Sequence, residues 1–469
     1  MLSVKTQMPR FSPLLLSLLV AGCSVGPDYK QPDIAAPSAW SGATDSGSQG
    51  PALQWWQGFG QDPLDKIMAT ALQNNYDLIA AGARIRQADA QLRISSSALL
   101  PTIQLSAGAT RSGQQTLATG KQSTVNNFNI LPGASYEIDF WGKNQDIKDA
   151  AEANAKASTY DWQTTHLTVQ ATVANTYFTI LALQDRIAVA EKNLENALGT
   201  LDAFQARMDV GTASGLDVAQ QESVVAEQRA ALPPLNQQLR QNTYALAILT
   251  GALPEALTLD RIALNTDKLP TVNAGLPSQL LTRRPDVRWS EEQLIAANAT
   301  IKSNIASVYP SISLTAEGGI ESRALNTLLN PVSLLFSIGA SLTQPIFKGE
   351  ALQGNIDLAR AKFEELTANY QKSVISAFQD VESALAAVEM TSKQEEAQKV
   401  AVSTALHTQE IVLAQMRSGT VDILTVLNVQ RTLFQAQDQL VQVKLAHVQA
   451  LIGLFRALGG GWTAETALH

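Results

Sequence analysis

Two pairs of segments in which apolar and polar residues alternate constrain this chain more than any other feature of its sequence. A long stretch of helical pattern separates the first pair from the second, and the four segments are 101–111, 126–140, 310–321 and 333–343. Alternation with a period of two predicts β-strands that are apolar on one face and polar on the other. We therefore expect two β-hairpins within a largely helical chain, with loops at 112–125 and 322–331.

The helical pattern around the hairpins follows the same order in both halves of the chain. Apolar periodicity predicts helices at 63–98, 142–209, 216–250 and 349–417, and a last helix that ends near 458. At 1.5 Å per residue, the helix over 142–209 is roughly 100 Å long. Matching residues recur at an offset near 208, which predicts an internal duplication: Met208 with Met416, Gly211 with Gly419, Leu216 with Leu424, and Gly251 with Gly459.

The N-terminus has the pattern of a short secretion signal that ends in a cysteine. Lys5 and Arg10 supply a basic region, and the apolar stretch at 11–21 is too short to span a bilayer. Small residues directly precede Cys23, as in the bacterial lipobox, where the peptidase cuts and the cysteine becomes lipidated. An ordinary signal peptide that happens to contain a cysteine is the alternative. Ser24, rather than aspartate, at the next position favours the outer membrane as the destination.

Composition excludes several classes of protein. Charged residues make up 16% of the chain, below the roughly 25% of ordinary soluble domains, so much of the surface is expected to face lipid or partner subunits. The net charge of −8 argues against a nucleic-acid partner, which would need a clustered basic face. No apolar run reaches the length of a transmembrane helix.

No feature of the sequence indicates catalysis. The single cysteine rules out a disulfide framework and a multi-cysteine zinc site, and the four histidines show no metal-ligand spacing. No Ser/His/Asp constellation is visible. We therefore expect no enzymatic activity, no metal, and no cofactor apart from a covalent lipid on Cys23.

The four strands suit a transmembrane β-barrel with a polar lumen better than a soluble sandwich, whose strands would also alternate. Open sheet edges are not tolerated in lipid, so the four strands must pair with strands of other copies. Two copies give eight strands and a filled interior, whereas three give twelve strands and a pore. Aromatic residues expected at the membrane interface stand at the bases of the hairpins: Phe140, Trp141, Tyr309 and Phe347.

The expected fold class is therefore an α+β membrane protein with an internal duplication. Each protomer contributes four transmembrane strands to a trimeric twelve-stranded barrel, and its long helices form a periplasmic coiled-coil tunnel.

Several motifs, in this order, resemble the outer membrane factor family of TolC-like exit ducts, in the lipoprotein branch represented by OprM and NodT. They are Gly26-Pro27-Asp28-Tyr29, Trp55-Trp56, Asn75-Tyr76-Asp77-Leu78, Tyr136-Glu137-Ile138-Asp139-Phe140-Trp141-Gly142, Ser214-Gly215-Leu216-Asp217, Arg283-Arg284-Pro285-Asp286-Val287, Gln344-Pro345-Ile346-Phe347 and Met416-Arg417-Ser418-Gly419. The resemblance implies a homotrimer in the outer membrane that acts as the exit duct of a tripartite efflux system. Its role would be passive, because an inner-membrane pump of the resistance-nodulation-division class and a periplasmic adaptor (membrane fusion) protein deliver the substrate.

The resemblance also implies an equatorial belt around the tunnel, formed by 40–62, 251–283 and 459–469. With the belt included, the expected parts are a signal peptide (1–22), a lipid-anchored tether and belt (23–62), a first repeat (63–250), an equatorial segment (251–283), a second repeat (284–458) and a C-terminal equatorial segment (459–469). The first repeat contains a β-hairpin at 101–141 and a helical hairpin at 142–250. The second repeat contains a β-hairpin at 310–347 and a helical hairpin at 349–458.

In this family the turns of the helical hairpins close the tunnel and dock the adaptor. The matching positions are Gly211, Ser214, Asp217, Gly419 and Asp422. Glycine is also needed to reverse a helical chain, and both aspartates can simply cap the helices that follow. Capping and docking are therefore both open.

Relatives of this branch close the tunnel with a ring of leucines, followed one turn later by an acidic ring. Leu424 matches the leucine, and Leu216 is its counterpart in the first repeat. Asn428 replaces the acidic residue, which puts an anionic ring in doubt. Periodicity alone also allows Leu424 to be ordinary coiled-coil core.

Two other functions compete with an exit duct. A coiled-coil envelope spacer would conduct nothing, but it would not need strands with a polar inner face. A soluble periplasmic adaptor would lack the amphipathic strands. The sequence does not identify the pump or the cargo, so drugs, siderophores, organic acids and metals all remain open.

Overall fold

The computed structural model describes residues 25–41, 52–115 and 122–460. The chain divides into two compact units, each built from three stretches of sequence. The first unit comprises Met1–Pro32, Ile85–Ser158 and Ser290–Tyr370, and the second comprises Asp33–Arg84, Thr159–Trp289 and Gln371–His469. Within the described ranges, no helix combines the length and hydropathy needed to cross a membrane.

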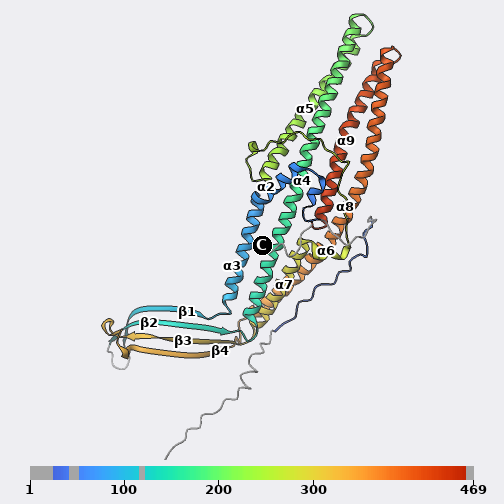
Figure 1. Cartoon of the computed structure of the whole chain (residues 1–469). Coiled ribbons are helices and arrows are strands. Elements are labelled where there is room, and N and C mark those ends of the chain that lie inside the picture. The colour runs from blue at the N-terminus through green and yellow to red at the C-terminus, as the bar shows by residue number, and fades with distance from the viewer. Residues whose placement is uncertain (1–24, 42–51, 116–121, 461–469) are drawn as a thin grey trace, which may run out of the picture. The chain divides into compact units, whose positions relative to one another are not determined.

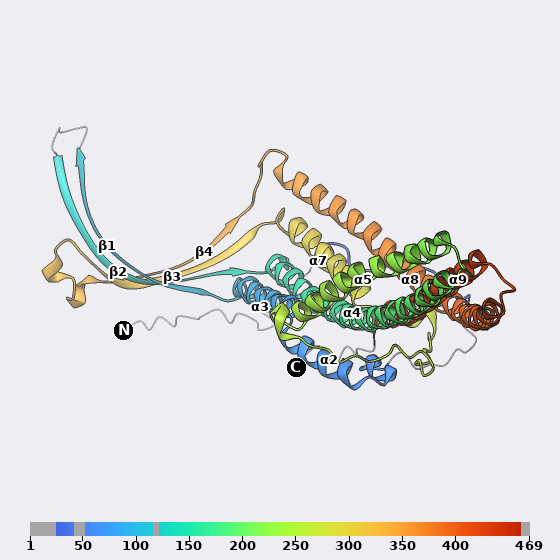
Figure 2. The ribbon, with the colours of Figure 1, turned by 90° about the horizontal axis from the view of Figure 1, so that it is seen from above.

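The first unit contains one antiparallel sheet of four strands in the order β1-β2-β3-β4 (Figure 1). The strands are β1 (Thr102–Gln115), β2 (Gln122–Ile138), β3 (Ser311–Ser322) and β4 (Leu334–Thr343). They lie side by side in both views (Figures 1 and 2). The register aligns apolar residues across all four strands on one face, with pairs such as Ile103–Ala134, Ile130–Ile320 and Ala316–Ile338.

The first hairpin is longer than its apolar alternation predicts. The pattern predicts a loop over 112–125, but Ser112 pairs with Val125 and Gln115 still pairs with Gln122. Alternation fades here because the side chains on both faces are mostly polar, whereas the ladder needs only backbone hydrogen bonds. The predicted loop at 322–331 contains the short helices η3 (Leu325–Thr327) and η4 (Pro331–Ser333), the second of which extends beyond it.

Two helical hairpins repeat with the same lengths. Helices α4 (Lys143–Asp209) and α8 (Ala351–Arg417) each have 67 residues, and α5 (Gly215–Leu249) and α9 (Ile423–Ala457) each have 35. Helices α3 (Tyr76–Ser97) and α7 (Pro285–Ala306) have 22 residues each. The matched lengths of these three pairs of helices confirm the predicted duplication.

The prediction of one helix over 63–98 is wrong in one respect, because the segment forms two helices. Helix α2 (Asp62–Asn74) ends before Asn75, and α3 begins after it. The Asn75 side-chain oxygen accepts hydrogen bonds from the backbone N–H groups of Asp77 and Leu78, at 2.9 and 3.2 Å. An asparagine that bonds to the backbone in this way starts a new helix rather than continuing the old one.

The second unit contains the main apolar core. Helix η1 (Trp55–Phe59) packs here, with Trp55 stacked on Phe455 at 5.0 Å between ring centroids and Phe59 against Phe178. Helices α2, α4 and α9 supply most of the rest of this cluster. The remaining short helices are η2 (Pro254–Ala256) and α6 (Pro277–Arg283). Trp40, in the tether, is also buried, and its indole N–H donates to the Gly275 carbonyl at 3.0 Å.

Candidate functional site

The turns of the two helical hairpins have the same backbone geometry. Gly211 and Gly419 adopt left-handed φ values of 76° and 73°. At each turn the glycine N–H and the next N–H donate back to carbonyls of the preceding helix, at 2.8–3.1 Å. This is the Schellman pattern, in which a residue without Cβ avoids the steric cost of the left-handed conformation. Both glycines are therefore required by the reversal of the chain.

Both candidate docking aspartates act as helix caps. Ser214 and Asp217 form a reciprocal capping box at the start of α5. Asp422 accepts from the backbone N–H of Thr425 at 3.1 Å at the start of α9. Hydrogen bonds from Thr425 lower the pKa of the Asp422 carboxyl, so it stays ionised. Capping by both residues is thus confirmed, while docking stays a prediction.

The two candidate gate leucines are exposed in the protomer. Leu424 is 53% exposed and Leu216 is 66% exposed. Both stand in the first turn of their helices, Leu424 in α9 and Leu216 in α5. Asn428, one turn beyond Leu424, is exposed as well. Leu424 is therefore not buried within its own protomer, and its role as a gate residue or as coiled-coil core between copies stays a prediction. An apolar side chain held at this position is available to a partner outside the protomer.

Direct contacts join the two helical hairpins, one near their turns and one farther along the helices. Arg207 on α4 donates to the Met416 carbonyl on α8 at 3.1 Å. Arg186 on α4 makes a forked ion pair with Asp438 on α9, at 2.6 and 3.1 Å. A movement of one hairpin relative to the other would have to break or rebuild these bonds. No sequence signal could have found them, because their partners are more than 200 residues apart.

Three of the four aromatic residues predicted for the membrane interface gather at the base of the sheet. Trp141 stacks on Tyr309 at 4.7 Å between centroids, and Phe140 packs against Trp141 edge-on at 4.8 Å. The Trp141 indole N–H donates to the Pro310 carbonyl at 2.8 Å. These contacts bring the two hairpin bases together. Phe347 is 87% exposed and makes none of these ring contacts.

The two faces of the sheet differ in chemistry. On the apolar face large side chains are open to the surroundings, including Phe336 at 80% and Ile338 at 82% exposed. The opposite face carries serine, threonine, glutamine and glycine, together with the carboxylates of Glu137, Glu317 and Glu321. Exposed apolar patches of this kind mark a membrane or partner surface.

Two polar clusters in the second unit have partners that do not follow from any sequence pattern, and the first of them is buried. In the first, the Glu395 side chain is 4% exposed, and it bonds to Thr266 at 2.5 Å, His447 at 2.7 Å and Lys399 at 2.9 Å. Burial alone would raise the pKa of Glu395, but these three hydrogen bonds outweigh it and lower the pKa. The cluster joins the 251–283 segment to α8 and α9.

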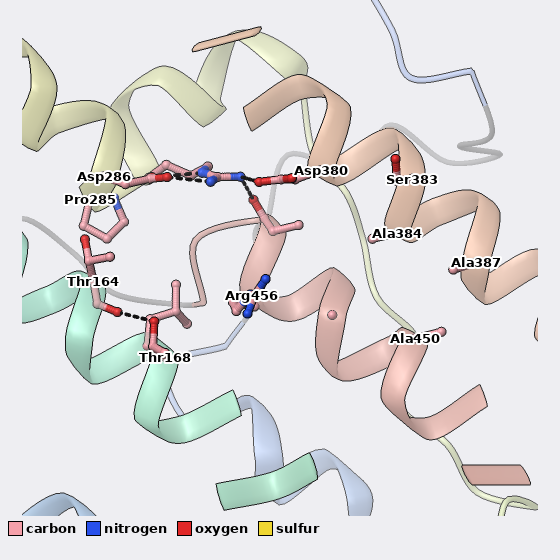
Figure 3. Close-up of a pocket in the computed structure, with 14 residues that line it drawn as sticks. Thr164, Thr168, Pro285, Asp286, Asp380, Ser383, Ala384, Ala387, Ala450 and Arg456 are labelled. Atoms are coloured by element: carbon pink, nitrogen blue, oxygen red, sulfur yellow. Dashed lines mark hydrogen bonds and ion pairs between the residues drawn. The ribbon is translucent and has the colours of Figure 1, made fainter. Parts of the chain in front are cut away.

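The second cluster gives a structural role to the Arg283-Arg284-Pro285-Asp286 motif. The Arg284 guanidinium lies between Asp286 and Asp380, at 2.5 and 2.8 Å (Figure 3). It also donates to the Ala457 carbonyl at the end of α9. The motif is visible in the sequence, but its partners on α8 and α9 are not.

Cys23 lies outside the described residues, so its lipidation stays a prediction. Among the residues that the structure covers, no group of three or more His, Cys, Asp or Glu side chains could hold a metal ion.

Comparisons with known proteins agree on one family. A profile described as "Outer membrane efflux protein" matches twice, at residues 67–252 and 276–460. The pyoverdine export outer membrane protein OpmQ of Pseudomonas aeruginosa is 38% identical over 98% of both chains. The toluene efflux pump outer membrane protein TtgF of Pseudomonas putida is 32% identical over 96% of both. The structure of the outer-membrane channel OprN superposes with a TM-score of 0.88 at 25% identity, covering 94% of this chain and 100% of that one.

The two profile matches coincide with the two repeats, and the relatives and the solved channel extend over nearly the whole sequence. The predicted resemblance, the fold class and the outer-membrane location are confirmed. The chain belongs to the outer membrane efflux protein family, and it is an exit duct of the outer membrane.

Proposed function

We propose that three copies of this chain form a passive duct, closed at rest at the turns of its helical hairpins. The observation that carries this proposal is the four-stranded sheet, which is apolar on one face and polar on the other. In the described chain the outer edges of β1 and β4 pair with no other strand. Unpaired edges are not tolerated in lipid, so strands of neighbouring copies must complete the sheet. Twelve strands leave room for an aqueous lumen, whereas eight do not.

Lateral surfaces of the helices support a closed ring. Helix α8 exposes several apolar side chains, each between 41% and 62% exposed: Ile375, Met390, Val400, Leu406 and Ile411. Helices α3 and α5 expose a second set, each between 44% and 70% exposed: Tyr76, Ile79, Tyr244 and Ile248. Two different apolar surfaces on one chain fit head-to-tail association, which produces a ring when the rotation closes.

The turns supply the gate and the docking surface in this proposal. Three copies of Leu424 would converge on the axis and exclude water and ions, as hydrophobic constrictions do. The adaptor would bind the turn residues Gly211, Ser214, Gly419 and the capping aspartates. Because the adaptor would bind the open state better than the closed state, its binding would shift the population toward opening.

The proposed partners follow from the family and from the passive role of the duct, which has no energy source of its own. An inner-membrane pump of the resistance-nodulation-division class and a periplasmic adaptor would supply the energy and the cargo. The names of the relatives refer to pyoverdine in one case and to toluene in another. Because related ducts of one fold carry such different cargoes in their names, we assign cargo choice to the pump. No enzymatic step is required of this chain.

A lipid on Cys23 is the first expected result. Replacing Cys23 by serine should leave an unprocessed or unanchored precursor, because the thiol is the acceptor of the diacylglycerol. Metabolic labelling with palmitate should mark the wild type and not the variant. Labelling of the variant at the wild-type level would contradict the lipobox.

Cysteines placed on the two faces of the sheet test whether the polar face lines a water-filled lumen. Glu317 on the polar face pairs with Ser337, so Phe336 next to it points to the opposite face. In proteoliposomes, Glu317→Cys should react rapidly with a charged, water-soluble thiol reagent, and Phe336→Cys should react slowly because lipid covers it. The wild-type protein, treated in parallel, corrects for Cys23.

Planar-bilayer recordings of the same samples test conduction itself. The duct predicts discrete current steps, whose size changes when the reagent modifies Glu317→Cys but not Phe336→Cys. Equal reactivity at both positions, together with no current, would instead favour the non-conducting spacer.

A further inference from the structure

Helix α9 packs against α4, a helix of the other repeat, through one face of each. The Gln449 side-chain amide of α9 donates to the Thr179 hydroxyl of α4 at 3.3 Å, and the forked ion pair joins Asp438 of α9 to Arg186 of α4. Thr179 and Arg186 lie two helical turns apart, on the same face of α4. These two contacts fix the register of the interface between the repeats.

The other two helices of the hairpins flank this pair. Helix α8 packs on the other side of α9, where Glu395 bonds to His447 at 2.7 Å. Helix α5 packs on α4, where Leu235 belongs to one apolar cluster with Leu183 and Ala190. Over the middle of the hairpins the order of the helices is therefore α5, α4, α9 and α8 (Figure 1). Helices α5 and α8 are the two ends of this row.

The duplication gives the contact face of α4 a counterpart on α8. An offset of 208 residues carries the bounds of α4 onto those of α8. The counterparts of Thr179 and Arg186 are Ala387 and Gln394. Between these two positions Met390 is 51% exposed, whereas its counterpart Ala182 on α4 is 1% exposed. The face that α9 covers on α4 is therefore open on α8.

The contact face of α9 has a counterpart on α5 in the same way. The same offset carries the bounds of α5 onto those of α9. The counterparts of Gln449 and Asp438 are Gln241 and Ala230, and both are exposed. On the same face Tyr244 is 44% exposed, whereas its counterpart Ile452 on α9 is fully buried. Each protomer thus has one open face like that of α4 and one open face like that of α9.

We propose that α8 of one copy binds α5 of the next copy in the register in which α4 binds α9 within one copy. Gln394 then faces Ala230 of the next copy, and Ala387 faces Gln241 of the next copy. Two different faces that fit each other produce head-to-tail association, which forms a ring when the rotation closes. The inference rests on the assembly of copies in the proposed function, and it adds the two faces and their register.

Transplanting the internal ion pair tests this register. Gln394→Arg combined with Ala230→Asp rebuilds the pair of Arg186 with Asp438 between copies. The combination should slow the dissociation of the full-length assembly in detergent about threefold beyond what the two single variants predict together. Within one protomer α4 and α9 separate the two positions, so the single variants should show no such gain.

A position on the other side of α8 provides the control. Ser392 is exposed and lies two residues before Gln394, about 200° around the helix. Ser392→Arg combined with Ala230→Asp should therefore give only the sum of its single effects. Equal coupling at Ser392 and Gln394, or none at Gln394, would overturn the proposed register.

Cross-linking tests the same contact without charge. Gln394→Cys combined with Ala230→Cys in one chain should yield covalent trimers with a short bifunctional thiol reagent, and Ser392→Cys combined with Ala230→Cys should not. The wild-type protein, treated in parallel, corrects for Cys23. A trimer that conducts but gives no cross-link at Gln394 would contradict the register and leave the duct standing. A monomer that conducts nothing would contradict the proposed function as well.

Discussion

Replacing Leu424 by alanine should raise the resting conductance of the duct several-fold while leaving its stability nearly unchanged. The conductance rises because three leucines at the axis are replaced by smaller side chains, which widens a constriction that excludes water. Stability changes little because Leu424 is 53% exposed in the protomer, and surface substitutions cost about 0.5 kcal/mol or less. The two readouts thus separate a gate residue from a core residue.

A leucine on the same helix provides the matched control. Leu433 is 1% exposed, so Leu433→Ala should lower the free energy of unfolding by about 2–5 kcal/mol. It should not open the constriction. Planar-bilayer recordings and melting curves on both variants give the comparison. If Leu424→Ala loses stability as Leu433→Ala does and its resting current is unchanged, the gate assignment is wrong.

Opening the turns has an energetic cost that the structure identifies. The hydrogen bond from Arg207 to Met416 and the ion pair between Arg186 and Asp438 hold the two hairpins of one protomer together. An outward movement of α5 and α9 that preserves both interactions moves the two hairpins as one body, whereas a movement that separates the hairpins breaks them. The adaptor would have to compensate for each bond that breaks, because a ligand shifts an equilibrium only by its differential affinity for the two states.

The sequence predicts the elements of this fold better than their ends. The strand faces, the long helices and the duplication all follow from patterns that repeat over many residues. The break at Asn75 and the pairing of 112–115 do not, because one side chain decides the first and backbone hydrogen bonds alone decide the second. Neither feature changes the apolar period.

The candidate site is only partly readable from sequence for a different reason. Gly211 and Gly419 stand out because their conformation is a local property. The partners of Arg284 and Glu395 lie on helices distant in sequence, so no spacing rule brings Asp380 or His447 to them. The exposure of Leu424 likewise depends on how the protomer folds. The apolar periodicity of the sequence does not distinguish an exposed leucine from a buried one.

Asp146 predicts a pH dependence of stability in the first unit. Its side chain is 4% exposed in the first turn of α4, with Lys302 at 3.4 Å from one oxygen and no described hydrogen-bond partner for the other. Burial raises the pKa of Asp146 to about 6, against a lowering by Lys302, with smaller increases from Asp149 and Asp139. Between about pH 4 and pH 6 the folded state therefore holds a proton that the unfolded state has already lost.

The sign of the pH dependence follows from this difference in proton binding. As the pH rises from about 4 to 6, the unfolded chain ionises this carboxyl more easily than the folded one, so wild-type stability falls by about 3 kcal/mol from this group and then levels off. Asp146→Asn cannot ionise, and its amide oxygen can still accept from Lys302. Its melting temperature relative to wild type should therefore rise between pH 4.5 and pH 7.5, measured in detergent at constant ionic strength. Asp89→Asn, at an exposed position on α3, should show no such trend. A difference between Asp146→Asn and wild type that stays constant with pH would mean that Asp146 is ionised in the folded state throughout this range.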